Sequence, residues 1–167
     1  LYTASLGLDH PIAIRYPRGR GKYPNSEVQI LKKSFEKIEI GKAHLLKSGS
    51  KTAVLSTGFI GNNVTLALQK ISNTTAAHYD FGFVKPLDES LLHEIFTSFE
   101  TIITLEDSAV KGGFGSAVIE FASQNNYSKN IHSLGIPDAF IEHGTIEELQ
   151  NICGIDVESL VHLFSKQ

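Results

Sequence analysis

Short apolar runs alternate with amphipathic helical segments from residue 52 to the end of the chain, and this alternation limits the possible folds most. "TAVLSTG" (52–58) and "TIITL" (101–105) are continuous apolar runs, typical of strands buried on both faces of a parallel sheet. "NNVTLALQKI" (62–71) and "PLDESLLHEIFTSF" (86–99) repeat apolar residues with helical spacing. The pattern predicts an α/β fold with three layers, α/β/α, around a mostly parallel sheet.

We expect about five strands in this sheet. The first, near residues 38–47, alternates apolar and polar residues, so we expect it to be half-buried. We also expect this strand to be antiparallel to the rest. A separate short strand, "IAI", is expected at 12–14. Thr145 and Glu148 have the spacing of a capping box at a helix start. The other expected strands are 75–84, 101–106 and 130–137, and the later helices are 115–125, 145–153 and 157–164.

Composition and charge exclude several classes of protein. The 167 residues suffice for one domain with a core, and the net charge of −3 argues against a nucleic-acid partner held by a general basic field. No apolar stretch approaches the roughly 20 residues of a membrane span. Cys153 is the only cysteine, so no internal disulfide can form, and we expect a cytoplasmic protein. The sequence contains no Met, from which we expect the chain to be a piece of a larger protein.

The segment "RYPRGRG" (15–21) is basic and broken by proline and glycine, so we expect a domain boundary near residues 17–30. Arg15, Arg18 and Arg20 carry planar guanidinium groups suited to phosphate, although a solvated basic linker would also contain them. Arg15 differs from the other two because it follows "IAI" directly. The carboxyl end of a strand is where α/β sheets place ligand-binding groups.

The stretch "LEDSAVKGGFGSAVIEF" (105–121) places glycines between a strand and a helix. Backbone N–H groups there could cradle a phosphate, or the glycines could serve only tight turning and close packing of the helix on the sheet. The spacing matches neither a Walker loop nor a dinucleotide fingerprint. Glu106 and Asp107 could be acid/base groups, but helix-capping or surface acids are more common. The seven histidines show no metal-ligand spacing, and we expect His143 to structure its loop.

Seven segments, taken in order along the chain, carry a resemblance to one known family: "LYTA", "PIAIRYPRG", "IGKAHLLKSG", "FVKPLDESLL", "LEDSAVKGGFGSAVIEF", "LGIPDAFIEHGT" and "GIDVESL". Together they resemble the carboxyl-terminal part of the 1-deoxy-D-xylulose-5-phosphate synthase family, whose members are transketolase-like enzymes. They follow the family's order over nearly the whole chain. One departure is Gly82, where the family usually has Arg before "FVKPLD".

This resemblance implies a transferase that decarboxylates pyruvate on thiamine diphosphate with Mg²⁺ and adds the two-carbon unit to D-glyceraldehyde 3-phosphate. The product feeds isoprenoid, thiamine and pyridoxal phosphate biosynthesis. The resemblance places the cofactor and metal sites, and the catalytic residues, in an amino-terminal domain and in the part of a middle domain that this chain lacks. We therefore expect the chain alone to be inactive, to bind no cofactor or metal, and to contribute to a homodimer of the full enzyme.

The resemblance also assigns parts of the chain. Residues 1–20 would end the pyrimidine-binding middle domain, 21–34 would be a linker, and 35–167 would form the transketolase-like C-terminal domain. Arg15 would hold the substrate phosphate, and the "GGFG" glycines would be structural. Two alternatives stay open at this point: the C-terminal domain of a 2-oxo-acid dehydrogenase β subunit, and a free-standing anion-binding module built on "GGFG".

Overall fold

The computed structural model describes residue 3, residues 11–16 and residues 37–166, and the chain divides into two compact units, Leu1–Ile40 and Gly41–Gln167. In the first unit, the Ile38 N–H donates to Thr3 Oγ1 at 2.9 Å. Residues 11–16 are exposed and form neither helix nor strand, so the strand expected at 12–14 is wrong. A strand needs a hydrogen-bonding neighbour, and the described residues of this unit include none in extended pairing.

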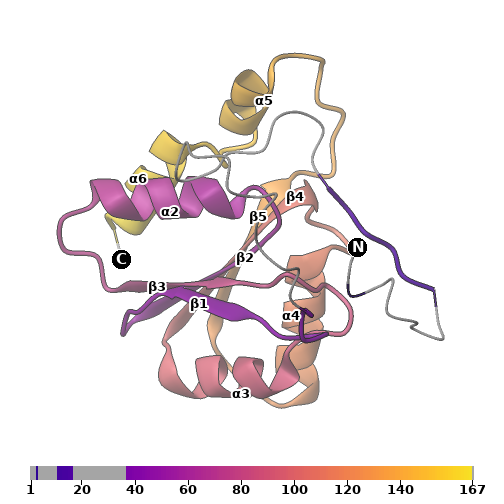
Figure 1. Cartoon of the computed structure of the whole chain (residues 1–167). Helices are drawn as coiled ribbons and strands as arrows, with labels where there is room; N and C mark the ends of the chain where they lie inside the picture. The colour runs from indigo at the N-terminus through magenta and orange to yellow at the C-terminus, as the bar shows by residue number, and fades with distance from the viewer. Residues whose placement is uncertain (1–2, 4–10, 17–36, 167) are drawn as a thin grey trace. The chain divides into compact units, whose positions relative to one another are not determined.

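The second unit is built on a five-stranded sheet in the order β1-β3-β2-β4-β5 (Figure 1). β3 pairs in parallel with β2, β2 with β4, and β4 with β5, whereas β1 is antiparallel to β3. The expected mostly parallel sheet with one antiparallel strand is confirmed. The strands are β1 (His44–Lys47), β2 (Thr52–Thr57), β3 (Ala76–Asp80), β4 (Thr101–Ala109) and β5 (Asn130–Ile136).

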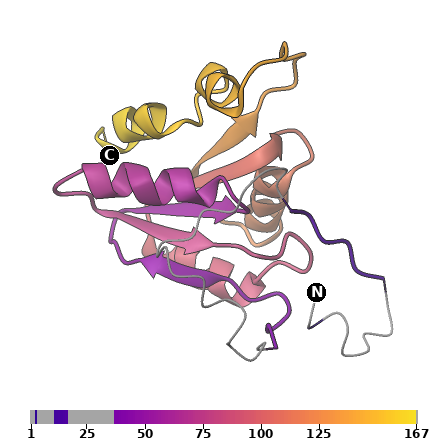
Figure 2. The same ribbon diagram turned by 45° about the horizontal axis from the view of Figure 1, so that its top comes forward.

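Helices cover both faces of the sheet, which confirms the three layers. Figure 1 shows α2 (Gly61–Lys70) and α6 (Val157–Phe164) on one face, with α3 (Glu89–Ser98) and α4 (Phe114–Gln124) on the other. Viewed from another angle, α5 (Ile146–Ile152) lies next to α6, on the same side of the sheet as α2 (Figure 2). No helix in the described ranges is long and apolar enough to cross a membrane.

Two hydrophobic clusters lie on opposite faces of the sheet, because alternate residues of a strand point to opposite faces. Ala53 and Leu55 of β2 pack toward α3 and α4, and Val54 between them packs toward α2 and α6. The first cluster also contains Ala77, Phe81, Leu92, Ile95, Phe96, Phe99, Ile102, Phe114, Val118, Phe121 and Ala122. The second also contains Ile60, Val64, Ala67, Leu68, Ala76, Ile103, Leu105, Ile155, Leu160 and Phe164.

The strand ends depart clearly from the sequence-based expectation in β1, β3 and β4. β3 ends at Asp80, four residues before the expected end at residue 84. β1 is shorter than residues 38–47 and is not half-buried, since Leu45 and Leu46 are both more than half exposed. The reason is its place at the edge of the sheet, where no helix of the described residues covers it. β4 continues three residues past Glu106, so this acid lies within the strand rather than at its end.

The helix caps follow local sequence rules. Asp88 begins α3 and accepts from the Leu91 N–H at 3.2 Å, and it also accepts from the Ala43 N–H ahead of β1. Thr145 and Glu148 form the expected capping box at α5. The contacts to Leu91 and within the capping box satisfy N–H groups that the first turn of a helix leaves without partners.

Candidate functional site

Glu106 is buried between β4 and the start of α4, with 1 % of its surface exposed. The Phe114 N–H donates to Oε2 at 2.9 Å and the Gly115 N–H to Oε1 at 2.9 Å. The Ser108 hydroxyl also donates to Oε2. The carboxylate therefore sits at the positive end of α4, where the helix dipole and free N–H groups favour an anion. Of the possible roles of Glu106, helix capping is the one observed.

The glycines shape this arrangement in different ways. Gly112 has a φ of +73°, which an L-residue adopts only with strain, and its N–H donates to Ser116 Oγ at 2.9 Å. Gly113 has an ordinary φ of −90°, but a Cβ on it would lie 2.1 Å from Glu106 Oε2 and 2.5 Å from the Ala109 carbonyl oxygen. The chain therefore needs glycine at position 112 to make the turn, and glycine at position 113 to bring the start of α4 close to Glu106.

The N–H groups of residues 112–115 all have acceptors within the chain. Those of Phe114 and Gly115 bind Glu106, that of Gly112 binds Ser116, and that of Gly113 reaches the Val110 carbonyl oxygen at 3.5 Å. A phosphate in this loop would have to displace these acceptors. The geometry therefore favours the structural interpretation of "GGFG" over the phosphate cradle.

Two buried hydroxyl oxygens beside this carboxylate site have no hydrogen-bond partner among the residues that the structure describes: Thr104 Oγ1 of β4 and Ser133 Oγ of β5. The two residues pair across the parallel strands. A Cβ on Gly115 would lie 2.6 Å from each of these oxygens, so both are in close contact with the backbone that donates to Glu106. Unpaired buried hydroxyls are uncommon and call for an explanation.

A second buried polar cluster lies on the other face, under the start of α2. Ser56 Oγ is 2.8 Å from His78 Nε2, and Thr65 Oγ1 is 3.4 Å from His78 Nδ1. Burial lowers the pKa of His78 to about 4, because the cluster is desolvated and the charged imidazolium is disfavoured. A Cβ on Gly61, the first residue of α2, would lie 2.6 Å from Ser56 Oγ.

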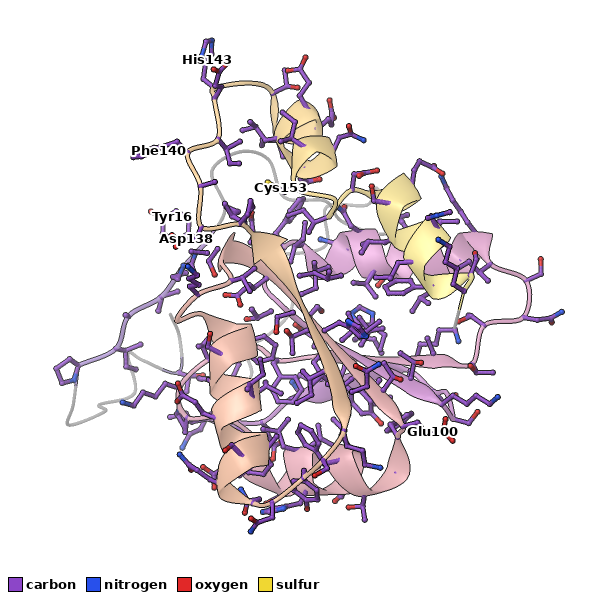
Figure 3. The ribbon with its side chains drawn as sticks, turned by 180° about the vertical axis from the view of Figure 1, so that it is seen from behind. Tyr16, Glu100, Asp138, Phe140, His143 and Cys153 are labelled. Carbon is purple, nitrogen blue, oxygen red and sulfur yellow. The ribbon has the colours of Figure 1, made fainter. Side chains whose placement is uncertain are left out.

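The structure describes only some of the other residues that were singled out in the sequence. Arg15 is exposed in the 11–16 segment of the first unit, and Arg18 and Arg20 lie outside the described residues. Asp107 is exposed beside the buried Glu106. His143 is exposed on the loop from β5 to α5, where it and Phe140 point away from the sheet (Figure 3).

The described residues contain no group of three or more His, Cys, Asp or Glu side chains that could hold a metal ion. Sequence reasoning missed the Ser56–His78 cluster. The sequence gives one signal for it. His78 lies two residues after Ala76 in the same strand, so both side chains point to the same, buried face of the sheet.

A search of protein families matches residues 41–160 to the family described as "Transketolase, C-terminal domain". Curated relatives are called 1-deoxy-D-xylulose-5-phosphate synthase. The protein of Parabacteroides distasonis is 44 % identical over 169 residues, covering 100 % of this chain and 26 % of the relative. That of Cytophaga hutchinsonii is 47 % identical over 163 residues, covering 96 % of this chain and 25 % of the relative. The chain thus spans about a quarter of the length of the relatives it matches.

Among solved structures, the chain resembles one called "Split gene transketolase, inactive beta4 tetramer". The TM-score is 0.67 and the sequence identity 27 %, over 78 % of this chain and 43 % of that chain. The likeness is consistent with the fold of a transketolase C-terminal domain.

Proposed function

Because the chain belongs to the transketolase C-terminal domain family, we propose that it is the carboxyl-terminal part of an enzyme that makes 1-deoxy-D-xylulose 5-phosphate. The enzyme would condense pyruvate with D-glyceraldehyde 3-phosphate and release CO₂. The observation that carries this proposal is identity of 40–47 % to synthases of this name along 90–100 % of the chain.

Thiamine diphosphate and Mg²⁺ would belong to the full enzyme. Two observations support placing both groups outside this chain: the N–H groups of 112–115 have acceptors within the chain, and the described residues include no metal-binding cluster. We infer that both bind to other domains, and that this chain alone is catalytically inactive. The structural neighbour, which is named as an inactive beta4 tetramer of a split gene transketolase, supports this inference.

The domain assignment remains a proposal: 1–20 as the end of a middle domain, 21–34 as a linker, and 35–167 as the C-terminal domain. The division of the chain after Ile40 and the family match from residue 41 support a domain start near the end of this linker. The C-terminal domain would be structural and would help to pair two subunits. Exposed apolar side chains of Leu45, Leu46 and Phe140 are suited to such contacts. The lone Cys153 is consistent with a cytoplasmic location.

A chimera tests the function directly. The matching carboxyl-terminal quarter of the Parabacteroides distasonis relative would be replaced by this chain, and product formation measured with both substrates, thiamine diphosphate and Mg²⁺. We expect the chimera to make 1-deoxy-D-xylulose 5-phosphate, and the separate chain to make none. A folded chimera without synthase activity, or turnover by the chain alone, would contradict the proposal.

Arg15 is proposed to bind the phosphate of D-glyceraldehyde 3-phosphate. A charge-assisted hydrogen bond contributes roughly 1.5–3 kcal/mol, so Arg15→Ala in the chimera should lower kcat/KM for this substrate about ten- to a hundredfold. Unphosphorylated glyceraldehyde should lose far less, and pyruvate decarboxylation should change little. Arg18→Ala and Arg20→Ala serve as matched controls with weaker expected effects. An unchanged preference for the phosphorylated aldehyde in Arg15→Ala would rule this role out.

A further inference from the structure

The start of α4 has the donors of an anion-binding site, yet an acidic side chain of the same chain already lies in it. We propose that this is a true ligand site whose resident ligand is the Glu106 carboxylate, and that a free small carboxylate binds there when this side chain is shortened. The site would be selective for a monocarboxylate of the size of acetate.

The contacts of Glu106 are those of a bound ligand. Its two oxygens accept from separate backbone N–H groups, those of Phe114 and Gly115, at 2.9 Å each. The Ser108 hydroxyl adds a third donor. Only 1 % of the residue is exposed, so the carboxylate is held by the protein rather than by water. The donors come from α4 and from the end of β4, and they are fixed by the fold rather than by Glu106 alone.

Two hydroxyls beside Gly115, those of Thr104 and Ser133, have no partner among the described residues and could donate hydrogen bonds to a ligand. Thr104 is fully buried, and its Oγ1 and the Oγ of Ser133 lie against Gly115, whose N–H donates to Glu106. Hydroxyls of Thr and Ser can donate as well as accept. The carboxylate of Glu106 is tied to β4 through its own side chain, whereas a free anion could shift to accept from these hydroxyls.

The size of the ligand follows from the covalent structure of the side chain. Glu106→Ala removes one methylene group and the carboxylate, which together correspond to acetate. Acetate is therefore the matched probe, and acetamide is a neutral molecule of nearly the same shape. An amide presents an N–H group to one of the two backbone donors, so acetamide should bind poorly.

The test is the thermal unfolding of the 167-residue Glu106→Ala chain in sodium acetate, with sodium chloride and acetamide as solute controls. Acetate should raise the unfolding midpoint in a saturable way, and at ten times its Kd it should lower the unfolding equilibrium constant about tenfold. The parent chain and Glu120→Ala, which alters an exposed acid on the same helix, should respond to acetate as they do to chloride.

A further variant distinguishes acetate binding at this site from a general effect of the solute on stability. Glu106→Gln keeps the space filled, so it should show no acetate response beyond that to chloride. If Glu106→Ala is unfolded at about 25 °C, the recovery of its helical circular dichroism at about 15 °C on addition of acetate replaces the thermal midpoint. The proposal is overturned if acetate has no specific effect on Glu106→Ala in either measurement, or if it acts equally on the parent or on Glu106→Gln.

Discussion

The starts of α4 and α2 both pack closely against a strand of the sheet, but the polar group buried at each start differs in charge. The N-cap of α4 and the first residue of α2 are both glycines in close contact with a polar side chain of a neighbouring strand. Gly113 lies against Glu106 of β4, and Gly61 lies against Ser56 of β2. The two strands are adjacent, and Thr57 pairs with Glu106 in register. At α4 the buried group is an acid, whereas at α2 it is a hydroxyl joined to an imidazole.

The difference shows what is needed to keep a polar group out of water. Burying a charge costs several kcal/mol unless donors or counter-charges surround it. At α4, two N–H groups and the helix dipole provide that stabilisation for Glu106. At α2, the imidazole of His78 has hydroxyls as its hydrogen-bond partners, so burial lowers its pKa to about 4 and the ring is neutral at pH 7.

Loss of the buried acid should have the largest effect. Glu106→Leu leaves two buried N–H groups without an acceptor, and each such loss costs roughly 1–3 kcal/mol, so the free energy of unfolding should fall by about 4 kcal/mol. Ser56→Ala, the counterpart under α2, should cost only about 1 kcal/mol. Urea denaturation of both variants measures the two values. Equal losses would show that the two helix starts do not differ in this way.

Acid should destabilise the α2 side through His78. The unfolded chain binds a proton at this residue below pH 6.5, while the folded chain resists protonation down to about pH 4. Stability from this group is therefore complete above pH 6.5 and is lost as the pH falls toward 4, by up to about 3 kcal/mol. Other groups also titrate in this range, so the measured quantity is the difference in denaturation between the parent and His78→Gln. A parent and variant with the same pH dependence would contradict the neutral, buried imidazole.

The two glycines should differ in their tolerance of a methyl group. In Gly113→Ala the new Cβ meets the Ala109 carbonyl oxygen as well as Glu106, and a backbone atom cannot move aside, so we expect a loss of about 3 kcal/mol. In Gly61→Ala the nearest atom is the Ser56 hydroxyl, which can rotate at the expense of its contact with His78. That substitution should cost about 1 kcal/mol. The reverse order in chemical denaturation would refute this account of the close contacts.

The smallest expected change in the free energy of unfolding belongs to an exposed ion pair. Lys111 Nζ lies 2.6 Å from Asp138 Oδ2, and both side chains are mostly exposed. Because water screens such pairs, Asp138→Asn should change the free energy of unfolding by about 0.5 kcal/mol or less. The change should vanish in about 0.5 M sodium chloride. An effect as large as that of Glu106→Leu would show that burial is not the deciding difference.

The sheet and most helices could be predicted because their signals are local. The apolar run at 52–58 and the helical spacing at 62–71 each specify an element without reference to distant residues. The strand expected at 12–14 is wrong because three apolar residues satisfy the same pattern without a pairing partner. The edge position of β1, which exposes Leu45 and Leu46, depends on strand order and has no local signal.

The site required contacts that sequence rules do not cover. Usual capping rules look for an acceptor directly before the helix, whereas Glu106 caps α4 from eight residues upstream and from within a strand. The sequence allows a capping acid as one alternative, but the burial of Glu106 and its two backbone donors have no local signal. The role proposed for Arg15 comes from the family resemblance alone, since its side chain lies in an exposed segment.

No residue of α5 is buried, and this determines where the domain should unfold locally. Its seven residues form only two turns, and Ile146 and Ile152 remain more than 60 % exposed. Asn63 of α2 donates to Gln150 of α5 at 2.9 Å, but short helices with so little buried surface are marginal in water. We therefore expect α5 to unravel in local fluctuations that leave the sheet intact. Its amides should exchange with deuterium well before those of β2 and β4. A fluorescent label placed on α5 would accordingly follow a different transition from one placed on the sheet.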